Sequence, residues 1–144
     1  MTRELCHELY KHWTNDASIY MDMHLFQPYV YDEATVNRYF DMKGQDASRR
    51  LFAIMLGDKV IGELQLKQID QDKKECSLSI HMQNDAVKGR GYGTQAERLA
   101  VKTAFDELGM AAVNADTVMK NTRSQHVLEK AGFVFDRAID VEED

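Results

Sequence analysis

The chain has 144 residues, of which 44% are hydrophobic and 29% charged, with 8 glycines and 1 proline. This length suits one domain over residues 1–144, and the apolar fraction excludes a disordered or collagen-like chain. The formal net charge of -6 argues against a nucleic-acid partner, because affinity for phosphate backbones comes mainly from lysine and arginine. Cys6 and Cys76 are too few for a disulfide framework and lack the paired spacing of a zinc site. We therefore expect no metal and a reducing, cytoplasmic location.

The first forty residues predict two helices. Apolar and aromatic residues recur at helical spacing from Glu4 to Trp13 and from Glu33 to Phe40, and Gln27-Pro28 marks a break between the two segments. Charged residues interrupt every turn of the first segment, which therefore does not resemble a signal peptide. The apolar run from Phe52 to Leu56 is far shorter than the roughly 20 residues that span a bilayer, so we expect no membrane partner.

The middle of the chain predicts three antiparallel strands. Leu51 to Leu56 is a continuous apolar run, Gly57-Asp58 is a turn, and Val60 to Ile69 alternates apolar with polar residues. The same alternation returns in a third strand, whose apolar side chains are Cys76, Leu78, Ile80 and Met82. Its polar side chains are Glu75, Ser77, Ser79 and His81.

The last third predicts alternating helices and strands. A glycine-rich turn leads into a helical pattern of apolar residues, Val101, Ala104, Phe105 and Leu108. Gly109 ends that helix, Ala112 to Val118 predicts a short strand, and the spacing of Thr122 and Gln125 predicts a capping box at the next helix. Phe133 to Ile139 predicts a last strand. The fold class is therefore α/β (α+β): a mixed, mostly antiparallel sheet with two N-terminal helices and two helices packed on the sheet.

The turn from Lys88 to Gly93 has the composition of an anion-binding loop. Its three glycines let the backbone approach phosphate oxygens, and the helix that follows begins with N–H groups that lack intrahelical acceptors. Residues 88–130 hold 7 Lys and Arg against 5 Asp and Glu, a net +2, which leaves -8 for the rest of the chain. The alternative is a plain strand-to-helix connection, because the glycine spacing fits neither the dinucleotide nor the Walker fingerprint.

Two segments together resemble the GNAT superfamily of N-acetyltransferases. Lys88-Gly89-Arg90-Gly91-Tyr92-Gly93-Thr94 is similar to that family's pyrophosphate loop for acetyl-CoA. Asn121-Thr122-Arg123-Ser124, followed by Val127 to Phe133, is similar to its second signature, in a wording closest to the RimJ/RimL-like branch. The resemblance covers about Arg50 to Phe135 and implies a GNAT-like sheet.

The resemblance also implies where acetyl-CoA would bind. The pyrophosphate would lie on the turn formed by Lys88, Gly89, Arg90, Gly91, Tyr92, Gly93 and Thr94. The backbone of Met82 and Gln83 would hydrogen-bond the pantetheine arm, as an added strand would. Asn121 and Ser124 would lie near the pantetheine and the thiol. The alternative for Asn121 is that it only begins a helix, and the alternative for Ser124 is that it is an ordinary surface serine.

The family reaction is direct attack of a neutral amine on the thioester, which needs neither cysteine. His81 is the candidate base, against the alternative of a solvent-facing histidine, and Glu63 is a lesser candidate. Many family members place a tyrosine seven residues after the asparagine, as an acid for the thiolate. Leu128 stands there in this chain, so Ser124 becomes the candidate acid.

The expected partner is a small-molecule or peptide amine. Family members usually begin with a strand, whereas this chain opens on a helical pattern, so we expect sheet edges that helices or a homodimer cover. The cluster of Tyr20, Met21, Met23, Phe26 and Tyr29 either packs in the core or walls the acceptor cleft. The competing hypothesis is a catalytically degenerate GNAT-fold protein that binds CoA as a sensor or assembly module.

Overall fold

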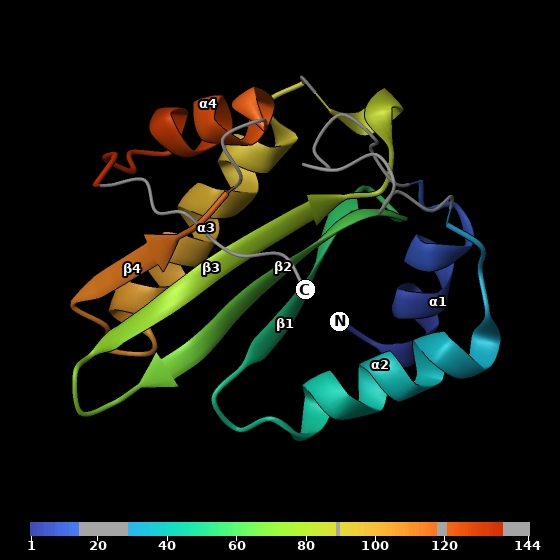
Figure 1. The fold of residues 1–144 in the computed structure, drawn as a ribbon, viewed down its shortest axis with the longest axis horizontal. Helices are drawn as coiled ribbons and strands as arrows, with labels where there is room; N and C mark the ends of the chain where they lie inside the picture. Colours follow the sequence, from blue (N-terminus) through green and yellow to red (C-terminus); the bar gives the residue numbers. More distant parts are fainter. Residues whose placement is uncertain (15–28, 89, 118–120, 137–144) are drawn as a thin grey trace, which may run out of the picture.

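The computed structural model describes residues 1–14, 29–88, 90–117 and 121–136 (Figure 1). Helices α1 (Arg3–Lys11) and α2 (Glu33–Gln45) precede three strands, β1 (Arg50–Leu56), β2 (Lys59–Asp70) and β3 (Glu75–Met82). A short 3-10 helix, η3 (Asp85–Val87), leads to α3 (Tyr92–Asp106), β4 (Ala112–Ala115) and α4 (Thr122–Lys130). Within these residues no helix is long and apolar enough to cross a membrane.

The four strands form one sheet in the order β1-β2-β3-β4. The first three strands pair antiparallel, whereas β4 runs parallel to β3. The predicted mixed, mostly antiparallel sheet is therefore confirmed. The parallel pairing joins Glu75–Leu78 only to Ala112–Ala115, so β3 continues from Ser79 to Met82 without β4 beside it.

The alternation of side chains divides the sheet into an apolar and a polar face. Helix α3 packs on the apolar face and α4 lies against α3, while α1 and α2 cover the opposite face (Figure 1). The core between the sheet and α3 consists of Leu64, Leu66, Cys76, Leu78, Ala100, Ala104 and Met110. Each large apolar side chain buried there contributes about 1.5 to 3 kcal/mol relative to exposure. The predicted alternation in β3 is thus the pattern that buries Cys76 and Leu78.

The residues just before the helices explain where each helix begins. The side chains of Thr2, Asp32 and Asn121 cap α1, α2 and α4 by accepting hydrogen bonds from backbone N–H groups. Helix α3 differs, because its N-cap residue is Gly91, which has a φ of 82° and no side chain that could accept a hydrogen bond. Its first N–H groups are therefore left for another acceptor.

Several sequence predictions need correction. The cap of α4 is Asn121, whose side chain accepts from the Ser124 N–H, so the predicted Thr122 capping box is wrong. Phe105 is 43% exposed, because the buried residues of α3 are Thr94, Glu97, Ala100 and Ala104. Residues 133–136 form no strand, and residues 137–139 of the predicted last strand lie outside the described residues.

Glu97 is an unusual member of the face that α3 buries. Its residue is 0% exposed, and neither carboxylate oxygen has a hydrogen-bond partner in the described part of the chain. Burial disfavours the charged carboxylate and raises the pKa of Glu97 from 4.5 to about 7. Near neutral pH, folding therefore has to bury a charge or hold a proton.

We predict that Glu97 lowers the free energy of unfolding as pH rises. The folded pKa lies above the unfolded value, so stability is fully present below about pH 4.5 and is lost as pH rises through about 7. The loss from this group amounts to roughly 3 kcal/mol. Urea denaturation between pH 4.5 and 8 should show this slope in the natural chain and a flatter one in Glu97→Gln. The exposed Glu107→Gln is the control, and equal slopes in all three proteins would refute the assignment.

Candidate active site

A cleft of about 210 Å³ opens where β3 runs past the end of β4. Its walls come from β3, from the end of β4 and from the first turns of α4: Leu78, Ser79, Ile80, His81, Ala115, Asp116, Thr117, Asn121, Ser124 and Leu128. Three predicted site residues, His81, Asn121 and Ser124, thus meet in one cleft although some forty residues of sequence separate them. Sequence reasoning missed Asp116 and Thr117, whose only signal is their position just after a short strand.

Beyond Leu78 the backbone of β3 faces this cleft without pairing to β4. The Gln83 N–H donates to the Ile61 oxygen at 2.8 Å, so the backbone of Gln83 faces β2. Because backbone groups alternate along a strand, those of Ile80 and Met82 face the side of β4, which ends opposite Leu78. Met82 therefore has the orientation that the predicted pantetheine contact needs, and Ile80 shares it. The sequence analysis did not identify Ile80.

Gln83 has a different role from the one predicted. Its residue is 1% exposed, its side-chain N–H donates to the Leu9 oxygen at 2.9 Å, and its carbonyl accepts from the Thr14 N–H at 3.0 Å. These bonds join the end of α1 to the end of β3, beside the cleft. Since its backbone groups are already paired, the structure does not favour Gln83 as a pantetheine ligand.

The glycine-rich turn lies at the N-terminus of α3. Residue 89 lies outside the described residues, but Gly91 adopts φ 82° and has no atom within 4 Å of the place where a Cβ would stand. A Cβ on Gly93 would lie 3.3 Å from Val127 and 3.8 Å from Ile80, so this glycine lets α3 pack closely on α4 and β3. Thr94 is buried at 8% exposure. The open backbone at Gly91 and the uncapped start of α3 suit an anion.

Asn121 and Ser124 lie together at the start of α4. The Ser124 N–H donates to the Asn121 side-chain oxygen at 3.0 Å. Asn121 therefore caps the helix, as expected if its role is structural. Both residues nevertheless line the cleft, and both are half-buried. Leu128 also lines the cleft, which makes its wall apolar where many family members place a tyrosine.

His81 points from β3 toward the face that α1 covers. It pairs across the strands with Glu63, and its ring lies 6.3 Å from the Trp13 ring. Although a large part of His81 is exposed, the protein around the ring lowers its pKa by desolvation, and the negative charge of Glu63 opposes this effect. A neutral imidazole that can accept a proton is the resulting form near neutral pH.

Glu63 is 1% exposed and lies in a network that the sequence analysis did not identify. The Tyr10 hydroxyl donates to its carboxylate at 2.6 Å, and the Tyr39 hydroxyl and the Gln65 amide donate to it as well. Burial, followed by the charge of Glu63, raises the pKa of both tyrosines. Because protein groups cover its oxygens, Glu63 is poorly placed to take a proton directly from an acceptor.

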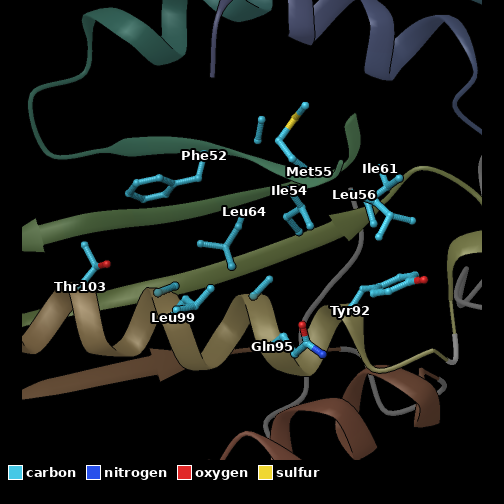
Figure 2. A pocket seen from close by; sticks show the side chains of 13 residues that line it. Phe52, Ile54, Met55, Leu56, Ile61, Leu64, Tyr92, Gln95, Leu99 and Thr103 are labelled. Atoms are coloured by element: carbon cyan, nitrogen blue, oxygen red, sulfur yellow. The ribbon is translucent and has the colours of Figure 1, made fainter. Parts of the chain in front are cut away.

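A second cleft, of about 320 Å³, lies between β1, β2 and α3 (Figure 2). Phe52, Ile54, Leu64 and Leu99 project toward it from the sheet and the helix (Figure 2). Tyr92, Gln95 and Thr103 are the polar residues of its lining, which holds no acid, base or cation that could act near neutral pH. The smaller cleft beyond β4 therefore has the better chemistry for catalysis. Of the predicted aromatic cluster only Tyr29 lies within the described residues, where its ring is 6.1 Å from that of Tyr10.

Residues 1–134 match the sequence profile of the family described as Acetyltransferase (GNAT) domain. The chain belongs to this family. A segment of 76 residues is 37% identical to the probable N-acetyltransferase YjcK of Bacillus subtilis (strain 168), and it covers 53% of this chain and 42% of that protein. Acetyltransferases of this family use acetyl-CoA, and the described residues contain no group of three or more His, Cys, Asp or Glu that could hold a metal ion.

Solved structures support the fold. A chimera of spermidine N-acetyltransferase SpeG from Vibrio cholerae and hSSAT superposes with a TM-score of 0.77 at 19% identity, over 95% of this chain and 79% of that one. Aminoglycoside acetyltransferase AAC(6')-Ib in complex with coenzyme A superposes with a TM-score of 0.72 at 20% identity, over 93% of this chain and 81% of that one. At these identities the likeness extends to the fold alone.

We predict that Gly91→Ala weakens acetyl-CoA binding about fivefold, because an alanine at φ 82° costs about 1 kcal/mol and strains the turn at the start of α3. Gly44→Ala is the matched control, since Gly44 also has open space around its Cβ position but no positive φ. Titration calorimetry with acetyl-CoA measures both. Equal affinities for the two variants would show that the turn does not hold the cofactor.

Proposed function

We propose that the chain is an acetyl-CoA-dependent N-acetyltransferase that moves an acetyl group directly to a primary amine. The observation that carries the proposal is the cleft beyond β4, in which unpaired backbone, His81 and Ser124 meet beside the uncapped start of α3. Membership in the GNAT family supports the same reaction. The match to the curated relative covers only 42% of that protein, so the activity of the whole chain is part of this proposal.

Acetyl-CoA supplies an activated acetyl group as a thioester. The residues that would hold its pyrophosphate are Lys88, Gly89, Arg90, Gly91, Tyr92, Gly93 and Thr94. Lys88 and Arg90 add positive charge to the N–H groups of the helix start. The backbone of Ile80 and Met82 would bind the pantetheine arm by strand-like hydrogen bonds, with Asn121 and Ser124 near its thiol end.

Catalysis would depend mainly on holding the amine and the thioester together, which contributes up to about 7 to 11 kcal/mol in well-oriented systems. The amine nitrogen bonds to the carbonyl carbon, the carbon–sulfur bond breaks, and the amine proton passes to His81 directly or through water. Ser124 would relay a proton from water to the thiolate, so that its hydroxyl gains a proton as it gives one up. Both cysteines are buried, and burial raises the pKa of each thiol, which favours direct transfer over an acyl-cysteine.

The acceptor would be a peptide N-terminus or a small amine. The second signature, with Asn121, Ser124 and Gly132-Phe133, is closest to the RimJ/RimL-like branch and favours a peptide. The names of the structural neighbours, a spermidine and an aminoglycoside acetyltransferase, favour small cationic amines. We place the reaction in the cytoplasm, with neither nucleic acid nor membrane as partner, and propose that a homodimer covers the outer edge of β1.

Leu128 favours a second candidate function, a CoA-binding sensor or assembly module without turnover. It lines the cleft where many family members carry a proton-donating tyrosine. Such a module would bind acetyl-CoA through the same turn and transfer nothing.

We predict that the chain releases thiol from acetyl-CoA in the presence of a suitable amine. A thiol reagent should detect this release with at least one acceptor from a panel of peptides, polyamines and aminoglycosides, and mass spectrometry should find one added acetyl group on that acceptor. Stabilisation by acetyl-CoA without transfer to any acceptor would instead identify the binding module.

We predict that His81→Gln lowers kcat/KM by roughly 10² to 10⁴ for a lysine-like amine, which is mostly protonated at neutral pH and needs a base. Binding of acetyl-CoA should stay unchanged, because the turn at α3 is untouched. His126→Gln, an exposed histidine on α4, is the control. If His81→Gln retained full activity toward such an amine across the pH range, His81 would not be the base.

A further inference from the structure

The Glu63 carboxylate is buried close to the candidate site, and no described cation forms an ion pair with it. Its residue is 1% exposed, and it takes part in none of the ion pairs among the described residues. Arg49 donates to the side-chain oxygen of Gln65 and not to Glu63. An uncompensated buried charge is costly, so its retention suggests a role.

Three hydrogen-bond donors from different elements surround the Glu63 carboxylate. The Tyr10 hydroxyl donates to Oε2 at 2.6 Å, while the Tyr39 hydroxyl and the Gln65 amide donate to Oε1. Donors from α1, α2 and β2 therefore converge on one carboxylate. Hydrogen bonds to a charged form stabilise it against desolvation, and neutral donors do so without cancelling the charge.

This charge faces His81. Glu63 and His81 are direct partners across β2 and β3, a relation that places Cβ atoms about 4.5 to 5.5 Å apart. Gly62 keeps the strands close here, because a Cβ on it would lie 2.9 Å from the His81 oxygen. The other ionisable groups that act on this pair are Cys6 and Tyr10 from α1, Tyr39 from α2, Lys67 from β2 and Lys88 from the turn before α3.

We propose that Glu63 is a positioning residue whose buried negative charge keeps His81 basic enough to accept the proton of the acceptor amine. The proton moves from the ammonium nitrogen to the imidazole, and the carboxylate of Glu63 neither gains nor loses one. The imidazolium that forms then faces an anion, which stabilises it. The part of this proposal that concerns turnover rests on the proposed function, whereas the electrostatic part does not.

The test is NMR titration of the His81 imidazole in the full chain. Glu63→Gln should move its midpoint to lower pH by roughly half a unit or more, because the opposing negative charge is lost. Glu75→Gln is the matched control: it removes a carboxylate from the same face of the sheet at the far end of β3 and should leave the midpoint unchanged. Glu63→Asp, which keeps the charge, should retain most of the natural midpoint. An unchanged midpoint in Glu63→Gln would overturn the proposal.

A pH profile of kcat/KM distinguishes an effect of Glu63 on His81 from a purely structural role of Glu63. In Glu63→Gln the acidic limb should move to lower pH by the same amount as the NMR midpoint, and a stationary limb despite a shifted midpoint would overturn the positioning role. If the natural chain acetylates no acceptor at all, the proposed function fails, while the NMR comparison still decides the electrostatic claim.

Discussion

The early end of the β3–β4 pairing determines where the rest of the site lies. The two parallel strands share hydrogen bonds only as far as Leu78 and Ala115, after which β3 continues to Met82 alone. Its free backbone forms one wall of the cleft, and the chain that leaves β4 leads to α4, which forms the other. The turn after β3 then delivers the uncapped start of α3 to the same end of the sheet. A longer β4 would pair the β3 backbone that we propose binds the pantetheine arm, and it would close the cleft.

The two faces of β3 have separate functions. Alternate residues of this strand, Cys76 and Leu78 among them, enter the core beneath α3 and fix the strand in place. The intervening residues turn toward α1 and α2, where His81 meets Glu63 and Trp13. Gln83 ties the end of α1 to the end of the strand, so the helix that carries Tyr10 and Trp13 is held against the site. Packing on one face thus fixes the strand that carries the proposed base on the other.

Local patterns in the sequence predicted much of this arrangement. A continuous apolar run identified β1. Apolar alternation identified β2 and β3 closely, because burial of one face imposes a period of two. The glycines of residues 88–93 predicted the turn before α3. The capping box failed because Asn121 and Thr122 are adjacent and both suit a helix start, and only the geometry shows that Asn121 accepts the bond. Tyr10 and Tyr39 meet Glu63 across 53 and 24 residues, and no local period records such contacts.

Titration of isotope-labelled protein with acetyl-CoA, followed by amide chemical shifts, tests the account most directly. The account predicts that the largest changes fall on the amides of Ile80, Met82, Ser124 and residues 90–94, with little change along β1. Changes confined to the larger apolar cleft between β1 and α3, or no saturable change at millimolar acetyl-CoA, would contradict it.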